Sequence, residues 1–145
     1  YPLLNIYCHV KPVNNFKKTY IGLEHNQVIS TGNFLLTTLH TPGHFPDSVC
    51  YWNKEDKIIF TGDTVFIGRT GRTVSKGSNI KDLYKSIYNI ILKIPHETII
   101  CSGHHYGFAK HEALIFNIKN FNFFQCNNLN EFIKIMDHFE KNRKK

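Results

Sequence analysis

Long apolar segments are absent from this chain of 145 residues. No run of 18 or more apolar residues occurs, and a transmembrane helix needs about that many. The first residues also show no basic region followed by an apolar stretch and a small-residue cleavage site, which is the pattern of a secretory signal. We therefore expect no membrane partner.

Cysteine is scarce and widely spaced. The four cysteines are Cys8, Cys50, Cys101 and Cys126, and no Cys-x-x-Cys pair indicates a zinc knuckle or a redox motif. Such usage favours reduced thiols in an intracellular, cytoplasmic protein. The sequence leaves organellar targeting open.

Acidic residues are outnumbered, because 11 Asp and Glu stand against 18 Lys and Arg, for a formal charge of +7. This surplus favours anionic partners in general, small molecules and nucleic acids alike. No platform of aromatic and basic residues accompanies the charge, so nucleic-acid binding is not the favoured interpretation. The length suits one globular domain over residues 1–145, and the oligomeric state stays open.

Strand-like segments are well represented. Residues 34–39 are rich in aromatic, aliphatic and β-branched types. Residues 48–52 and 57–60 flank the turn-like residues 53–56, which predicts a hairpin. Residues 97–101 predict another short strand.

Two segments have the period of an amphipathic helix. The first follows Asn79, ends at Pro95, and has one apolar face made by Leu83, Ile87, Ile90, Ile91 and Ile94. The second begins near Asn128, with Glu131 in its first turn, and its inward face consists of Phe132, Met136 and Phe139. Together with the strands, these helices predict a mixed α/β (α+β) fold.

Three of the predicted strands lead into motifs that carry metal-ligand residue types. The motifs are Thr41-Pro42-Gly43-His44, Thr61-Gly62-Asp63-Thr64 and Ser102-Gly103-His104-His105. Taken singly, each is ordinary turn chemistry. Their order, with a strand before each, indicates a site, because functional residues are often held on loops at the ends of rigid strands. Zinc favours imidazole nitrogen and carboxylate oxygen, so His44, Asp63 and His104 are candidate metal ligands.

These motifs resemble the metallo-β-lactamase superfamily and, within it, the glyoxalase II (hydroxyacylglutathione hydrolase) branch, over roughly residues 28–122. The resemblance implies an αββα sandwich, in which two sheets pack face to face beneath outer helices. It also implies that His44 completes one metal site, that Asp63 bridges two metal ions, and that His104 completes the second site.

The first motif of that family, His-x-His-x-Asp-His, has no counterpart here, because no two histidines are two residues apart. The opening residues 1–7 resemble the strand that follows this motif. The resemblance therefore implies the C-terminal part of the sandwich, N-terminally incomplete. With two ligands left for each metal ion, we expect little or no activity from this chain alone.

Two residues are candidates for substrate binding. Arg72 stands where the family has a basic residue that holds glutathione, and its planar fork suits a carboxylate. An internal salt bridge or a plain surface position is an equal alternative for Arg72. Tyr106 matches the Tyr that follows the late histidine, which implies contact with substrate.

The function that the resemblance implies is metal-dependent hydrolysis of a small anionic thioester, a hydroxyacylglutathione of the S-lactoylglutathione type. A metal-bound hydroxide would attack the thioester carbonyl while Asp63 orients it, with two zinc ions per complete domain, or iron or manganese in their place. Residues 130–136 instead resemble the tail of the persulfide dioxygenases, which bind one iron. A degenerate, non-catalytic domain is the third alternative.

Overall fold

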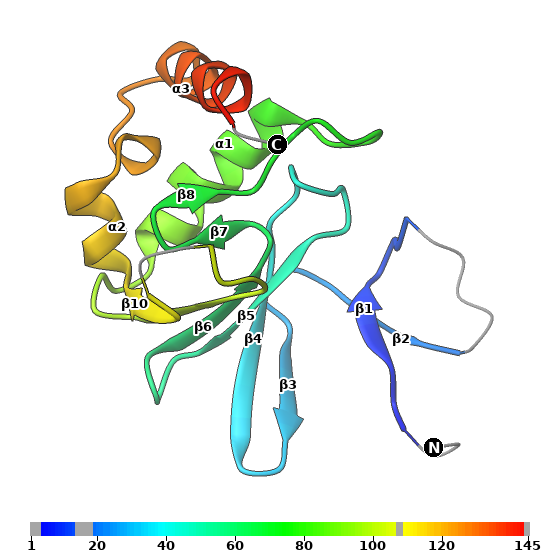
Figure 1. Cartoon of the computed structure of the whole chain (residues 1–145). Coiled ribbons are helices and arrows are strands. Elements are labelled where there is room, and N and C mark those ends of the chain that lie inside the picture. Colours follow the sequence, from blue (N-terminus) through cyan, green and yellow to red (C-terminus); the bar gives the residue numbers. More distant parts are fainter. Residues whose placement is uncertain (1–3, 14–18, 107–108, 144–145) are drawn as a thin grey trace.

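The computed structural model of the chain describes residues 4–13, 19–106 and 109–143. Its centre is a six-stranded sheet with the strand order β10-β9-β6-β5-β4-β3 (Figure 1). The strands are β3 (Val28–Thr31), β4 (Phe34–His40), β5 (Val49–Asn53), β6 (Ile58–Gly62), β9 (Ile99–Ser102) and β10 (His111–Ala113). The predicted hairpin is confirmed, because β5 and β6 pair in antiparallel fashion.

Strand direction decides where the motifs lie. Strand β5 is antiparallel to both β4 and β6, and β6 is parallel to β9. Strands β4, β6 and β9 therefore run in the same direction and end at the same edge of the sheet. The three predicted ligands each follow one of these ends, so the topology brings them to one place.

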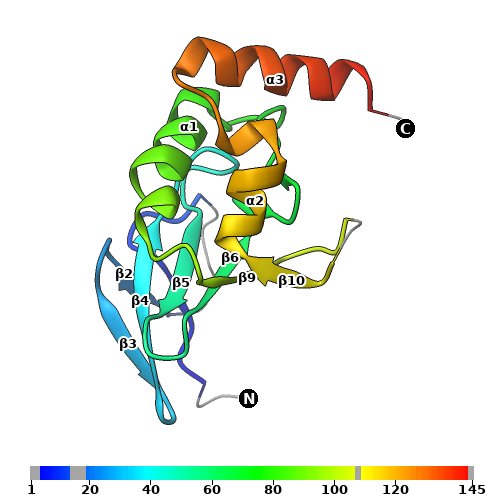
Figure 2. The same cartoon turned by 90° about the vertical axis from the view of Figure 1, so that its left-hand side faces the viewer.

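One face of the sheet is covered by the helices α1 (Ile80–Asn89) and α2 (Leu114–Asn120), and α3 (Leu129–Lys141) packs on α1 at the top of the molecule in Figure 2. Side chains alternate along the strands, and those on the helix side form the core. The buried core residues from the sheet include Leu39, Cys50, Ile59 and Ile100. The helices contribute Leu83, Ile87, Leu114, Phe132 and Met136.

The first predicted helix is shorter than its apolar period. Asn79 caps α1, since its side-chain oxygen accepts from the Lys81 amide at 2.9 Å. The helix ends at Asn89, because Ile90 adopts φ −122° and ψ −66°. A 3₁₀ turn, Ile91–Lys93, follows. Adjacent β-branched side chains crowd a helical backbone, and the tighter turn still buries Ile91 in the core.

The second predicted helix is confirmed as α3. The Asn128 side chain accepts from the Glu131 amide at 3.0 Å, and the Glu131 carboxylate accepts from the Asn127 amide at 2.8 Å. This reciprocal capping satisfies amides that have no partner within the helix. The inward face that the sequence predicted includes Phe132 and Met136, both fully buried or nearly so.

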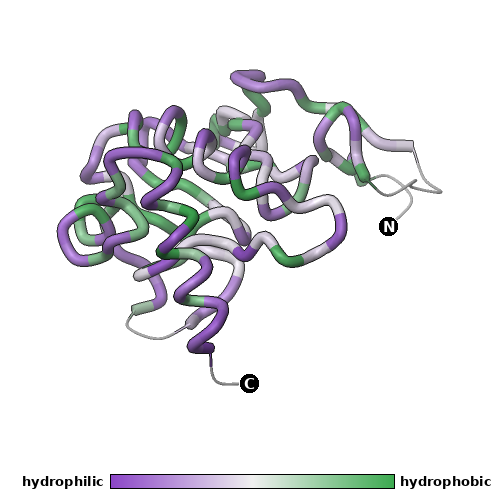
Figure 3. Tube along the Cα trace, turned by 90° about the horizontal axis from the view of Figure 1, so that it is seen from above, coloured by the Kyte–Doolittle hydropathy of each residue, from purple (hydrophilic) through white to green (hydrophobic). Residues whose placement is uncertain are grey.

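Several short elements were not predicted. Strands β1 (Tyr7–His9) and β2 (Ile21–Leu23) pair in parallel and extend away from the body of the sheet and helices (Figure 1, Figure 3). Strands β7 (Val65–Phe66) and β8 (Arg69–Thr70) form a small hairpin beside the main sheet. A second 3₁₀ turn spans Asn122–Phe124. Two- and three-residue strands carry too little periodicity to be seen in sequence.

Three further observations concern the cysteines, the helices and the opening residues. All four cysteines are free thiols, as expected. Over the described ranges, no helix has both the length and the apolar character needed to cross a bilayer. Of the opening residues 1–7, which resemble a strand of the family, Tyr7 lies in β1 and residues 4–6 lie in no strand, while residues 1–3 lie outside the described part.

Candidate metal centre

His44 is carried by a loop that is fixed to the start of α1. Gly43 in this loop has φ +139°, and a Cβ there would lie 2.3 Å from the Leu83 backbone. Only glycine allows so close an approach. The Gly43 carbonyl accepts from the Asn79 amide at 2.8 Å, and the Pro42 carbonyl accepts from the Ser86 hydroxyl at 2.7 Å. The loop therefore cannot shift without moving the helix.

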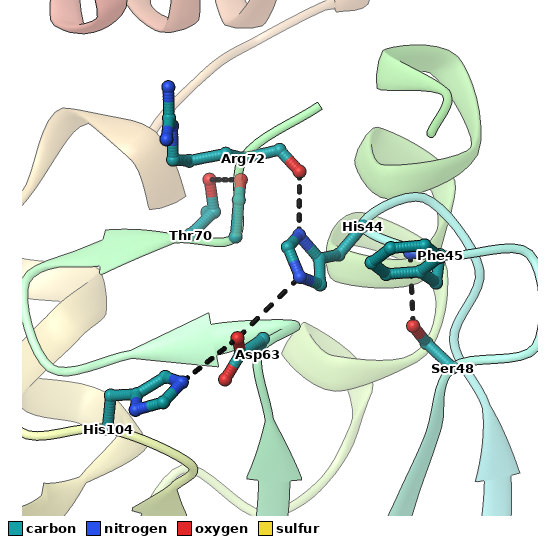
Figure 4. A network of polar contacts seen from close by, with 8 residues as sticks. His44, Phe45, Ser48, Asp63, Thr70, Arg72 and His104 are labelled. Carbon is teal, nitrogen blue, oxygen red and sulfur yellow. Dashed lines mark hydrogen bonds and ion pairs between the residues drawn. The ribbon is translucent and has the colours of Figure 1, made fainter. Parts of the chain in front are cut away.

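The ring of His44 is oriented by a backbone group. Its Nδ1 lies 2.8 Å from the carbonyl oxygen of Arg72, and a carbonyl can only accept (Figure 4). Nδ1 therefore carries the proton, which leaves the lone pair on Nε2 of the neutral ring. A hydrogen bond of this kind commonly fixes metal-binding histidines. His44 thus presents Nε2 toward Asp63.

Asp63 stands between two histidines. Its Oδ2 lies 3.6 Å from His44 Nε2 and 3.4 Å from His104 Nε2 (Figure 4). Both distances exceed those of ordinary hydrogen bonds. Two ligands at about 2.0–2.1 Å from a tetrahedral zinc ion would be separated by about 3.3–3.4 Å. His44 and Asp63 are therefore spaced so that both could bind one cation, and His104 and Asp63 are spaced so that both could bind another.

The arrangement offers one carboxylate oxygen that faces two histidines, rather than one complete site. Nowhere in the described residues are three or more His, Cys, Asp or Glu side chains grouped so that they could hold a single ion. In Figure 4, His44 and His104 lie on opposite sides of the Asp63 carboxylate. Each of two ions would thus receive two ligands from this chain, a histidine and Asp63. The donor types suit zinc, and the assignment of these three residues as ligands stays a prediction.

Two glycines let neighbouring loops approach Asp63 closely. A Cβ on Gly103 would lie 2.6 Å from Asp63 Oδ1, and a Cβ on Gly71 would lie 2.0 Å from the Asp63 carbonyl oxygen. The Gly103 amide also donates to the Gly62 carbonyl at 2.8 Å. The backbone at Gly103 therefore lies against the Asp63 carboxylate, and the backbone at Gly71 lies against the Asp63 carbonyl group.

Buried threonines support the loops from beneath. The Thr61 hydroxyl donates to the Val65 carbonyl at 2.7 Å, and the hydroxyls of Thr41 and Thr64 lie 3.2 Å apart. All three threonines are almost fully buried. No role was predicted for these threonines, although two of them open the motifs of His44 and Asp63. Above this layer the site is open, since the side chain of His104 is 57% exposed and that of Asp63 is 31% exposed.

Arg72 does not direct its guanidinium into the site. Its Nε and Nη2 donate to the two carboxylate oxygens of Glu140 on α3, both at 2.7 Å. The hydrogen bonds to Glu140 raise the pKa of Arg72 and lower the pKa of Glu140. The side chain points away from Asp63 (Figure 4). Of the alternatives that the sequence left open, the internal salt bridge is the one formed, and only the backbone of Arg72 contacts the site.

Tyr106 lies beside His104, where the sequence placed it. The two ring centroids are 5.4 Å apart, and Tyr106 also makes an edge contact with Phe66 at 5.0 Å. The Tyr106 side chain is 49% exposed. Its position next to a predicted ligand is compatible with substrate contact, which stays a prediction.

Known proteins resemble this chain over most of its length. The family model described as "Metallo-beta-lactamase superfamily" matches residues 9–104. The "Probable polyketide biosynthesis zinc-dependent hydrolase BaeB" of Bacillus velezensis is 31% identical over 127 residues, which cover 88% of this chain and 55% of BaeB. The hydroxyacylglutathione hydrolase of Dictyostelium discoideum is 37% identical over 90 residues, which cover 58% of this chain and 33% of that enzyme.

A solved structure agrees with this picture. ETHE1 from Myxococcus xanthus matches with a TM-score of 0.82 and 25% identity, covering 97% of this chain and 60% of ETHE1. The mixed α/β fold predicted from the strand and helix patterns is therefore confirmed. The chain spans only part of each of these relatives, from 33% of the hydroxyacylglutathione hydrolase to 60% of ETHE1.

Proposed function

The chain belongs to the metallo-beta-lactamase superfamily, and from that premise we propose that it forms part of a metal-dependent thioester hydrolase with two metal ions. The observation that supports this most directly is the position of Asp63 Oδ2, at 3.6 Å from His44 Nε2 and 3.4 Å from His104 Nε2. The further ligands would come from residues outside these 145, such as the His-x-His-x-Asp-His motif of the family.

The substrate we propose is a glutathione thioester of a hydroxy acid, of the S-lactoylglutathione type. This choice is supported by the sequences of the three ligand motifs, which resemble glyoxalase II, and by the similarity to a hydroxyacylglutathione hydrolase. The net charge of +7 also favours an anionic substrate. Zinc is the metal we favour, because BaeB carries the name of a zinc-dependent hydrolase; iron and manganese are the alternatives.

Bound zinc would supply a water with its pKa lowered toward about 7 and would favour negative charge developing on the substrate carbonyl. The residues of this chain would fix the geometry. The Arg72 carbonyl holds His44 in the tautomer that presents Nε2. Asp63 would orient the attacking water through its carboxylate, against which the backbone at Gly103 lies. A thiolate is a good leaving group, so a separate acid is not required.

A persulfide dioxygenase is the second candidate. It is favoured by the match to ETHE1, which covers 97% of this chain at a TM-score of 0.82. Such an enzyme would hold one iron rather than two zinc ions, so the metal content separates the two candidates.

The test is metal content per chain by plasma mass spectrometry, on the 145-residue chain and on a form extended upstream to include any His-x-His-x-Asp-His motif. About two zinc ions in the extended form, with hydrolysis of S-lactoylglutathione, would support the hydrolase. About one iron would shift the assignment to the dioxygenase. Absence of metal from both forms would contradict both enzymes.

A pair of variants sharpens the test. Asp63→Asn keeps the shape of the side chain but removes its charge, so it should release metal and abolish hydrolysis while the fold persists. His111→Gln is the matched control, because His111 is exposed on β10 and matches no ligand position of the family. Equal loss in both variants, or retained activity in Asp63→Asn, would remove Asp63 from the site.

A further inference from the structure

Arg69 is a positive charge beside the candidate metal centre that no described carboxylate neutralises. The described ion pairs include Arg72 with Glu140 but none with Arg69. The negative charge of Glu140 interacts with Arg69, but both carboxylate oxygens of Glu140 already accept hydrogen bonds from Arg72. Arg69 therefore keeps its charge available for another anion.

Aromatic rings hold the guanidinium of Arg69 in place. Its Cζ lies 3.8 Å from the ring centroid of Tyr106, and 5.3 Å from those of both Phe66 and Phe139. Each such contact contributes about 0.5–2 kcal/mol and favours the planar guanidinium over a flexible ammonium. Desolvation by these neighbours lowers the pKa of Arg69, yet arginine stays charged at any physiological pH.

The hydrogen-bonding groups of Arg69 are unused within the described part of the chain. Its Nε is buried and has no acceptor. Its terminal nitrogens likewise donate no hydrogen bond to a described residue, and Arg69 as a whole is only half-buried. A planar fork with free terminal donors is the group that binds carboxylate and phosphate oxygens most favourably.

The path from Arg69 to the metal centre is short and continuous. Tyr106 contacts Arg69 on one side and lies 5.4 Å from the His104 ring on the other. Phe66 pairs with Arg69 across the β7–β8 hairpin, and its ring centroid lies 6.3 Å from that of His104. A substrate with its reacting carbonyl at Asp63 could thus extend across Tyr106 to Arg69.

We propose that Arg69 binds an oxyanion, a carboxylate or a phosphate, on the non-reacting part of the substrate. Phe66 and Tyr106 line the route from the metal centre, and Arg72 serves α3 instead of the ligand. The inference rests on the proposed function, because it concerns the same site. It assigns recognition to a residue that the sequence motifs did not single out.

The test is a binding measurement on the 145-residue chain by isothermal titration calorimetry, which needs no turnover. Three probes are used: glutathione, glutathione diethyl ester with both carboxylates masked, and inorganic phosphate. Arg69→Gln should weaken glutathione binding by about 10-fold or more, as expected for a lost charge-assisted hydrogen bond, and leave the diester unchanged. Arg69→Lys keeps the charge without the fork and should give an intermediate loss.

Lys54→Gln is the matched control. Lys54 also lies over an aromatic ring, at 5.0 Å from the Trp52 centroid. It belongs to the β5–β6 turn, at the opposite end of β6 from Asp63. Removing this cation should leave glutathione affinity at the wild-type value, while thermal melting checks that all variants remain folded.

Each outcome decides the matter. Unchanged glutathione affinity in Arg69→Gln, or equal losses for glutathione and its diester, would overturn the proposal, the second result indicating a purely structural role. No binding of any probe to the wild-type chain would also overturn it. Inhibition of glutathione binding by phosphate, lost in Arg69→Gln, would support the site and extend it to phosphate-bearing substrates.

The failure of this inference is separable from that of the proposed function. If the extended form binds metal and cleaves thioesters but Arg69→Gln leaves KM unchanged, only the role of Arg69 fails. If Arg69-dependent glutathione binding occurs but the extended form holds no metal and cleaves no thioester, only the hydrolase assignment fails.

Discussion

Replacing Gly103 by alanine should displace the Asp63 carboxylate without unfolding the protein. The added Cβ would lie 2.6 Å from Asp63 Oδ1, whereas ordinary contact begins at 3.4 Å, so the oxygen must move by about 0.8 Å. Metal–ligand distances hold to about ±0.2 Å. The displacement is therefore several times what a metal site tolerates.

The cost to folding should be small by comparison. The Asp63 oxygen is the free end of a side chain, and the other contacts, with the Gly62 carbonyl group at 3.2 and 3.3 Å, need shifts of only a few tenths of an ångström. Alanine also restricts the unfolded chain, which offsets part of that cost. We expect the free energy of unfolding to change by less than about 1 kcal/mol.

The assay is zinc affinity by competition with a chromophoric chelator, alongside thermal melting by circular dichroism. Gly103→Ala should lose about 10-fold to 100-fold in zinc affinity, as when a ligand is misplaced. Gly71→Ala is the contrasting variant, because its Cβ would lie 2.0 Å from the backbone oxygen of Asp63, which cannot rotate away. That variant should lose at least about 2 kcal/mol of stability. Wild-type zinc affinity in a folded Gly103→Ala chain would refute Asp63 as a ligand.

Three further variants test the supports of the site. Asn117→Ala should lower the free energy of unfolding by about 2–3 kcal/mol in a denaturant titration. The buried Asn117 side chain accepts from the Gly68 amide and donates to the Phe66 carbonyl, both at 2.8 Å. A loss below about 0.5 kcal/mol would contradict this link between α2 and the β7–β8 hairpin. Glu140→Gln should lose about 1 kcal/mol at pH 7, reduced by partial exposure of the pair. The pKa of Glu140 is lowered from 4.5, so its contribution holds above that value and disappears as pH falls below it; a difference between wild type and Glu140→Gln that persists at about pH 2 would contradict the assignment. Asn128→Ala should lower the free energy of unfolding by about 1 kcal/mol through loss of the α3 cap, with Asn130→Ala, one residue inside the helix, as its control.

Local chemistry explains what could be predicted from sequence. The cap at Asn128 lies within three residues of the amide it satisfies, and the hairpin of β5 and β6 follows from alternating segments around one turn. The three motifs could also be recognised in the sequence, because in each of them a predicted strand leads into a turn that contains a His or Asp. These signals depend on neighbours in the chain, so one sequence is enough to see them.

Other features depended on residues far away in the chain. The direction of the Arg72 side chain depends on its ion pair with Glu140, which lies 68 residues later in the chain. From the sequence alone, this ion pair could not be ranked above a contact between Arg72 and substrate. The helix α1 ends before Ile90 although the apolar period continues in the sequence. Ile91 reaches the core from the 3₁₀ turn that follows, so a longer α-helix is not needed to bury it. The aromatic surroundings of Arg69 come from β7, the His104 loop and α3, which only folding brings together.

The sequence by itself determined which residue types stand at the strand ends, and hence the family and the candidate ligands His44, Asp63 and His104. Only the tertiary structure decided that both histidines face one oxygen of Asp63. The physical reason is the sheet order: β4, β6 and β9 run in the same direction, so loops that are distant in sequence meet at one edge. Glycines at positions 71 and 103 then allow the approach that any Cβ would prevent.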